Sequence, residues 1–284
     1  MIKTICICGS GTMGSGIAQV CAQSGFNTIL FDVNEIILER SKETIKKNLQ
    51  YLTDKQKISS EEKERIFFRI QFTKDIKNCV GDVIIEAIVE ILEAKVNLFN
   101  QLAAVNDAHT IFATNTSSLS VTAIQKNIVS PERVVGMHFF NPAPVMKLIE
   151  VVKGEMTNNG IVETIYALCK QISKHPVMCK DAPGFIVNRV ARHYYLEAMK
   201  LVEEEIATFE NIDIIMESVG FKMGPFKLMD LIGMDINLSV SQSMYEAFNR
   251  TERFKPSQIQ IEKVKKGELG KKTGKGFYDY DPIP

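Results

Sequence analysis

A histidine and a glutamate near the middle of the sequence are the residues best suited to acid/base chemistry. His138 ends the apolar run Val134–His138, and Glu150 lies within the next apolar run, Lys147–Val152. If these runs pair as strands across a proline-containing turn, the imidazole and the carboxylate come within cross-strand reach. An imidazole exchanges protons near neutral pH. A lone histidine is more often structural, so the catalytic interpretation depends on this carboxylate and on a nearby cofactor site.

A glycine-rich turn at the start of the chain predicts that cofactor site. Gly9, Gly11 and Gly14 form a G-x-G-x-x-G pattern between an apolar run and a helical segment. In this context the first glycine allows a tight turn, the second lets a pyrophosphate approach, and the third allows close packing of helix on strand. The loop, with Thr12 and Met13, and the positive end of the helix should face the phosphates. The expected ligand is a dinucleotide.

An aspartate at the end of the next apolar run narrows the choice of dinucleotide. Asp32 follows the glycines by about twenty residues, where a carboxylate can accept both hydroxyls of an adenosine ribose. The carboxylate would repel a 2′-phosphate, and Val33 and Asn34 offer no arginine to bind one. The sequence therefore favours NAD over NADP. The simpler alternative is that Asp32 only caps the following helix.

The segments that should position these residues alternate between strand and helix. Apolar runs at 70–73, 83–85 and 111–114 are separated by helical segments, which is typical of a mainly parallel, doubly wound sheet. Ligands of such sheets bind at the carboxyl ends of the strands. Glu86, Glu90 and the segment Asn115–Ser118 follow such ends. Lys95 lies near Glu90, so it is either the partner of an ion pair or a ribose contact.

Residues 34 to 69 are polar and helical in character, and we expect a helical hairpin that is broken near Thr53 and Asp54. Its lysines have two interpretations, a solvated surface, which is favoured, or a contact with a phosphorylated substrate tail. The lysines in question are Lys46, Lys47, Lys55 and Lys57.

The character of the sequence changes after Lys180. Residues 182–184 predict a hinge, and helices are expected from residue 185 onward, around 211–219, 226–248 and 257–266. The helix that begins near residue 185 has an apolar stripe. Asn188 lies on another side of this helix, where its side chain can face the neighbouring domain. The basic, glycine-rich tail 270–280 is either a packed loop or an anion contact. The expected domains are 1–183, an α/β Rossmann-like domain, and 184–284, an all-α domain. The residues of the stripe are Ile186, Val190, Tyr194, Ala198, Leu201 and Val202.

Composition excludes several classes of protein. The chain has 284 residues, with 34 basic and 34 acidic side chains and 45% hydrophobic residues. A net charge of zero provides no general attraction for nucleic acid or an anionic membrane, and neither a signal peptide nor a membrane-spanning run is expected. The six cysteines lack a CxxC pair, so we expect buried free thiols, no metal and a reducing cytoplasm.

Taken together, the motifs give the chain a close resemblance to the 3-hydroxyacyl-CoA dehydrogenase family, above all to its short bacterial 3-hydroxybutyryl-CoA members. The resemblance extends nearly end to end. It rests on the glycine loop and on five further segments: Asn115–Leu119, Gly136–Pro142, Asp181–Arg189, Met223–Phe226 and Lys272–Gly274.

This resemblance implies hydride transfer between C3 of an (S)-3-hydroxyacyl-CoA and NAD. His138 would be the acid/base, Glu150 would orient its ring, and Ser117 and Asn188 would hydrogen-bond the substrate oxygens. The resemblance further implies a role in fatty acid or butyrate metabolism and a homodimer formed through residues 185–284. It also assigns residues to the cofactor side, Glu90, Lys95, Ser117 and Asn141, and makes Lys55 and Lys272 possible CoA or cofactor contacts.

Two rival functions share the glycine loop. A dehydrogenase of free 3-hydroxy acids typically uses a lysine base, so the pair of His138 and Glu150 argues against it. A catalytically silent NAD-binding protein of the same fold is disfavoured by the complete set of Ser117, His138, Glu150 and Asn188.

Overall fold

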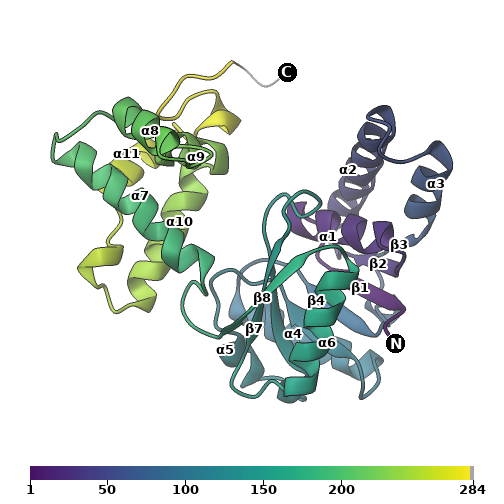
Figure 1. Ribbon diagram of the computed structural model, residues 1–284. Helices are drawn as coiled ribbons and strands as arrows, with labels where there is room; N and C mark the ends of the chain where they lie inside the picture. The colour runs from purple at the N-terminus through teal and green to yellow at the C-terminus, as the bar shows by residue number, and fades with distance from the viewer. Residues whose placement is uncertain (282–284) are drawn as a thin grey trace. The chain divides into compact units, whose positions relative to one another are not determined.

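The computed structural model describes residues 1–281 (Figure 1). The chain divides into two compact units, Met1–Ala182 and a second that begins at Pro183. Each unit has its own elements and its own core.

The first unit is built on a sheet of eight strands in the order β3-β2-β1-β4-β5-β6-β7-β8. The first six strands are parallel, β7 is antiparallel to β6, and β8 is parallel to β7. This arrangement confirms the predicted Rossmann-like fold with a mainly parallel sheet. The strands are β1 (Thr4–Cys8), β2 (Asn27–Phe31), β3 (Ile70–Thr73), β4 (Val83–Glu86), β5 (Ile111–Thr114), β6 (Val134–Phe139), β7 (Leu148–Lys153) and β8 (His175–Lys180).

Helices cover both faces of this sheet, which explains why its central strands are apolar on both sides. On one face, Ile5 and Ile7 of β1 pack with Ile17 of α1 in the main core. On the other face, Phe99 of α4 packs edge-to-face on Phe112 of β5, with ring centroids 5.5 Å apart. The helices of this unit are α1 (Thr12–Gln23), α2 (Glu35–Asp54), α3 (Ser60–Phe68), α4 (Leu92–Val105), α5 (Val121–Gln125) and α6 (Asn159–Gln171).

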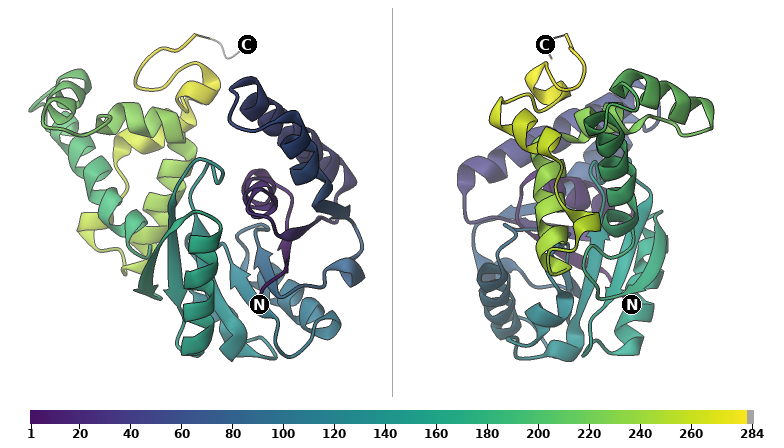
Figure 2. Two further views of the ribbon diagram at one scale, coloured as in Figure 1. Left: turned by 45° about the vertical axis from the view of Figure 1, so that its right-hand side comes forward. Right: turned by 90° about the vertical axis from the view of Figure 1, so that its left-hand side faces the viewer.

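The predicted helical hairpin is present as α2 and α3, which lie beyond α1 (Figure 2). The Asn34 side chain accepts hydrogen bonds from the first amides of α2, and the Ser59 side chain does the same for α3. These caps satisfy amides that have no partner inside a helix. The break between the helices lies at residues 55–59, just after the predicted position.

Strand β8 has no counterpart in the sequence prediction. It pairs only with β7, so it is an edge strand, and most of its residues are exposed or half-buried. Pro176 lies within it, and proline is tolerated on an edge strand because one side of the strand makes no ladder hydrogen bonds. An exposed strand with a proline lacks the apolar pattern by which the buried strands are found.

The second unit is helical, as predicted, but one expected helix is two. The predicted helix 226–248 is interrupted at Gly233, whose φ of 103° lies in a region that favours glycine. The sequence prediction missed this break because apolar residues continue on both sides. The helices are α7 (Val187–Glu203), α8 (Phe209–Ser218), α9 (Pro225–Ile232), α10 (Met234–Ala247) and α11 (Gln258–Lys265).

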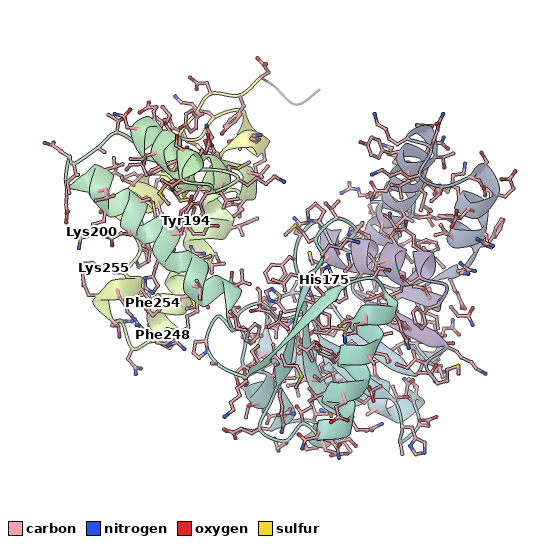
Figure 3. All side chains as sticks on the ribbon, in the orientation of Figure 1. His175, Tyr194, Lys200, Phe248, Phe254 and Lys255 are labelled. Carbon is pink, nitrogen blue, oxygen red and sulfur yellow. The ribbon has the colours of Figure 1, made fainter. Side chains whose placement is uncertain are left out.

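The apolar stripe predicted for α7 is only partly its buried face. Ala198 is buried, but Val190 is 67% exposed, and the residues that enter the core include Tyr195 and Met199. Tyr194, Leu201 and Val202 of the stripe also pack against this core, so the prediction fails only at Ile186 and Val190, which are exposed. Elsewhere in this unit, the rings of Phe248 and Phe254 stack with centroids 4.4 Å apart (Figure 3).

The tail after α11 packs onto the helices of its own unit. Asp230 of α9, which is 1% exposed, accepts hydrogen bonds from the amides of Phe277 and Tyr278 and from the hydroxyl of Tyr280. Of the two interpretations of the tail, the structure supports a packed loop.

Five of the six cysteines are buried. The Sγ atoms of Cys6, Cys8 and Cys79 lie within 4.8 Å of one another. Hydrogen bonds between the neighbouring thiols, together with burial, raise the pKa of Cys6 and Cys8 well above the usual value. The same hydrogen bonds, from Cys6 and Cys8, lower the pKa of Cys79 to about 5. A protonated thiol is a poor metal ligand, so Cys6 and Cys8 act as small core residues. Over residues 1–281, every helix is too short or too polar to cross a bilayer.

Candidate active site

His138 and Glu150 lie directly opposite each other on the antiparallel strands β6 and β7. The His138 Nδ1 atom is 2.7 Å from Glu150 Oε2, and the two residues are 5% and 1% exposed. At this distance the neutral ring donates its Nδ1 hydrogen to the carboxylate, which fixes both the tautomer and the ring orientation. The ring also contacts Phe140, with centroids 4.5 Å apart. The predicted cross-strand pair is therefore present, and its geometry suits proton transfer at Nε2.

The segment after β5 lies at the same edge of the sheet as His138. Strands β5 and β6 are parallel neighbours, with Thr114 beside Gly136. The Asn115 side chain accepts a hydrogen bond from the Phe139 amide at 2.8 Å, which joins the end of β5 to the end of β6. Ser117 lies two residues farther along this segment and is half-buried. The fold thus brings the Ser117 segment to the edge that carries the histidine.

The glycine loop lies at the carboxyl end of β1, and its glycines are required for different reasons. Gly9 has a φ of 100°, and a Cβ atom there would lie 2.5 Å from the Ala87 carbonyl oxygen. A Cβ atom at Gly14 would overlap the Gly9 carbonyl oxygen, whereas one at Gly11 would meet no atom within 4 Å. Gly14 therefore serves packing, and Gly11 faces open space.

The start of α1 fits the phosphates of a dinucleotide. Its N-cap residue is Gly11, so no side chain caps the helix, and its first turn contains no acidic residue. The first amides of a helix carry a partial positive charge and need acceptors. An uncapped helix start beside the open space at Gly11 is suited to bind an anion such as a pyrophosphate.

Asp32 bonds both the glycine loop and the residue that caps the next helix, because its Oδ1 atom accepts a hydrogen bond from the Asn34 amide at 2.9 Å. Its Oδ2 atom accepts hydrogen bonds from the Ser10 amide at 2.8 Å and from the Ser10 hydroxyl at 3.0 Å. The N-cap of α2 is Asn34, so the simpler interpretation of Asp32 as that cap is wrong. The ribose contact remains a prediction. A carboxylate fixed against this loop fits it, because an ionised carboxylate keeps acceptor positions beyond those used here.

The structure shows an ion pair at Lys95, one of its two predicted roles. Lys95 is 1% exposed, and its Nζ atom is 2.6 Å from Glu86 Oε1 and 3.0 Å from Glu90 Oε2. The Glu90 side chain is 34% exposed. The predicted cofactor contacts of both residues remain predictions.

The other predicted site residues are spread over both units. Asn141 is exposed in the connection between β6 and β7, and Lys55 is exposed at the end of α2, with its Nζ atom 5.7 Å from the centre of the Tyr51 ring. Asn188, in the first turn of α7, and Lys272 belong to the second unit. Lys272 pairs with Asp235 in the same unit at 2.5 Å, so an anion would have to compete with this aspartate.

Lys174 holds the connection between β6 and β7 in place, and no sequence motif predicts this role. Lys174 is 5% exposed and donates hydrogen bonds to the carbonyl oxygens of Ala143 at 2.5 Å and Met146 at 2.7 Å. Burial, together with the charge of Lys147, lowers the pKa of Lys174 to about 8. Lys174 thereby anchors the connection that carries Asn141. From the sequence alone, a lysine just before a strand is predicted to be a surface residue.

Known proteins match both units. Residues 4–182 match the NAD-binding domain of 3-hydroxyacyl-CoA dehydrogenase, and residues 184–280 match the C-terminal domain of that enzyme. The 3-hydroxyadipyl-CoA dehydrogenase of Escherichia coli is 47% identical over 98% of the chain, which spans 59% of that relative's length. The probable 3-hydroxybutyryl-CoA dehydrogenase of Bacillus subtilis is 39% identical over 99% of this chain and 98% of its own.

A solved structure agrees with these sequence matches. The crystal structure of (S)-3-hydroxybutyryl-CoA dehydrogenase from Ralstonia eutropha is similar to the chain with a TM-score of 0.94 and 35% identity, and the match covers 99% of this chain and 100% of that one. The chain belongs to the 3-hydroxyacyl-CoA dehydrogenase family, whose members are oxidoreductases that act on CH–OH donors with NAD as cofactor.

Proposed function

We propose that the chain interconverts (S)-3-hydroxybutyryl-CoA and acetoacetyl-CoA, with His138 as the acid/base. The observation that carries this proposal is the buried contact of 2.7 Å between His138 and Glu150. It lies in a sheet whose first strand leads into a glycine loop that suits NAD. The names of the relatives from Bacillus subtilis and Ralstonia eutropha support the substrate.

In the oxidation, His138 Nε2 takes the proton of the C3 hydroxyl while the C3 hydride leaves. Bound NAD supplies the hydride acceptor. Glu150 stabilises the imidazolium that forms, and burial of the pair strengthens this interaction because water does not screen it. In the reduction, the imidazolium returns its proton to the C3 oxygen. One histidine therefore serves both directions.

We assign the remaining roles by the same reasoning. Ser117 and Asn188 hydrogen-bond the substrate oxygens, with Asn188 contributed by the helical unit. Asn141 belongs to the cofactor side, because the connection that carries it lies against α1, where a Cβ atom at Gly16 would be 3.2 Å from Ala143 Cβ. Lys55 and Lys272 are contacts of the CoA moiety or the cofactor, and the partner of Lys272, Asp235, makes it the weaker of the two.

We also propose that the first unit binds NAD, and that the helical unit completes the substrate cleft and forms a homodimer in the cytoplasm. Large exposed apolar side chains in the helical unit support dimerisation, because such side chains gather at protein interfaces. They include Val190, Ile206, Ile214, Ile215, Val219, Phe221, Leu231 and Ile236. Light scattering on the purified chain tests this, and a monomer at micromolar concentration would contradict it.

The name of the relative from Escherichia coli suggests 3-hydroxyadipyl-CoA as a second candidate substrate. Its acyl chain is longer and ends in a carboxylate. The test of the proposed function is NADH oxidation, followed by absorbance, with three substrates. These are acetoacetyl-CoA, 3-oxoadipyl-CoA and free acetoacetate. We expect the highest kcat/KM with acetoacetyl-CoA. Preference for 3-oxoadipyl-CoA would favour the second substrate, and preference for free acetoacetate would contradict both.

A further inference from the structure

A group of buried charges supports the turn that carries Ser117. Glu86 ends β4 and is fully buried. Its Oε1 atom accepts a hydrogen bond from Lys95 Nζ at 2.6 Å and one from the Ile88 amide at 2.8 Å. Its Oε2 atom accepts one from the Thr114 hydroxyl at 2.6 Å. Glu86 thus joins the ends of β4 and β5 to Lys95 of α4, all elements of the first unit (Figure 1).

Lys95 also forms an ion pair with Glu90, and so it connects Glu86 to Glu90. Its Nζ atom lies between the two carboxylates, and the contact with Glu90 Oε2 is 3.0 Å. A buried ammonium is stable only when it is paired, and Lys95 is paired with both. The ion pair with Lys95 therefore fixes the position of the Glu90 carboxylate.

Glu90 in turn holds the residues that follow β5. Its Oε1 atom accepts hydrogen bonds from the Thr116 hydroxyl at 2.6 Å and from the amides of Ser117 at 2.9 Å and Ser118 at 3.0 Å. The Ser118 hydroxyl donates a further bond at 3.0 Å. Four donors from three consecutive residues meet one oxygen atom, so the backbone around Ser117 follows the position of this carboxylate.

The electrostatics keep Glu90 in the form that this role requires. Burial raises the pKa of Glu90, but the charge of Lys95 and hydrogen bonds from Thr116, Lys95 and Ser117 outweigh burial and bring the pKa to about 2. An ionised carboxylate only accepts hydrogen bonds, which suits a group surrounded by donors.

We propose that Glu90 is a positioning residue, which holds the Ser117 turn in its catalytic geometry and is itself held by Lys95 and Glu86. This rests on the proposed function, because Ser117 is a substrate contact there. The proposal differs from a cofactor contact. In that case Glu90 would act on NAD affinity directly and independently of Ser117.

The substitution Glu90→Gln tests whether Glu90 holds the Ser117 turn, and this test needs no measurement of activity. Glutamine has the same size, but it lacks the charge that attracts Lys95 and the turn. We expect the amides of a peptide spanning residues 115–119 to exchange hydrogen for deuterium about tenfold faster than in the native protein. The control is Glu93→Gln, the same substitution at an exposed position of α4, for which exchange should not change. Unchanged exchange in Glu90→Gln would overturn the proposal.

A double-mutant cycle tests the connection to catalysis. A displaced turn can cost about 10²-fold in turnover, so Glu90→Gln should lower kcat for acetoacetyl-CoA by up to this factor and leave the Kd of NADH within about threefold. In Ser117→Ala, the further substitution Glu90→Gln should cost little, because the side chain that it positions is gone. Additive losses, or a large loss of NADH affinity alone, would overturn the proposal. Failure of the native protein to reduce acetoacetyl-CoA would contradict the proposed function instead. The exchange experiment would still show whether Glu90 holds the Ser117 turn.

Discussion

The substitution Glu150→Gln removes the charge next to His138 and keeps a hydrogen-bond acceptor of the same size. At 2.7 Å and an effective dielectric constant of about 20, the full attraction between a carboxylate and an imidazolium is about 6 kcal/mol, which is an upper bound. The lower bound is about 1 kcal/mol, the difference between a charged and a neutral hydrogen bond. A loss of about 3 kcal/mol lies between them and corresponds to a decrease in kcat of about 10²-fold.

The assay is steady-state oxidation of NADH by acetoacetyl-CoA across a range of pH, with NADH affinity measured separately. Because the imidazolium loses its charged partner, the oxidation of 3-hydroxybutyryl-CoA by the variant should also extend to lower pH. Glu155→Gln, the same change at an exposed position after β7, is the matched control and should behave as the native protein. A kcat within threefold of native for Glu150→Gln, with an unchanged pH profile, would refute the role of the pair.

Four further predictions concern the cofactor site and acid stability. Gly14→Ala should lower the Tm, because the new Cβ overlaps the Gly9 carbonyl. Gly11→Ala should keep the Tm but weaken NADH binding by about tenfold or more, and native affinity in a titration would place the pyrophosphate elsewhere. Asp32→Ser combined with Val33→Arg should raise the kcat/KM ratio of NADPH to NADH, and a native preference for NADPH would contradict the role of Asp32. Glu90 should contribute about 2 kcal/mol of stability, after allowance for solvent screening, above its unfolded pKa of about 4.5. This contribution is lost as the pH falls toward 2, and urea unfolding of Glu90→Gln should show a weaker dependence on pH over that range.

The parts of the fold that the sequence predicts are those with a strong local signal. Buried strands such as β4 and β5 are continuous apolar runs, and parallel strands of this kind must be covered on both faces. The proximity of His138 and Glu150 is predicted from two apolar runs joined by a proline-containing connection, and the register of the strands places the two residues directly opposite each other. The glycine loop is predictable because steric overlap excludes a side chain at Gly9 and Gly14, while Gly11 leaves room for a ligand.

The remaining features depend on contacts between distant segments. Lys174 is indistinguishable from a surface lysine until the connection that it anchors is folded over it. The four hydrogen bonds to Glu90 Oε1 join segments separated by 26 to 28 residues. The exposure of Val190 in the first turn of α7 depends on which segments lie beside that turn, and the sequence of the helix does not contain this information.

The central claim is that His138 transfers the proton, and His138→Ala tests it most directly. Single-turnover reduction of acetoacetyl-CoA should be slower by about 10²- to 10⁴-fold, which is the usual contribution of a general acid. The Kd of NADH, measured on the same sample, should stay within about threefold of native. Near-native turnover with intact NADH binding would contradict the assignment of the proton transfer to His138.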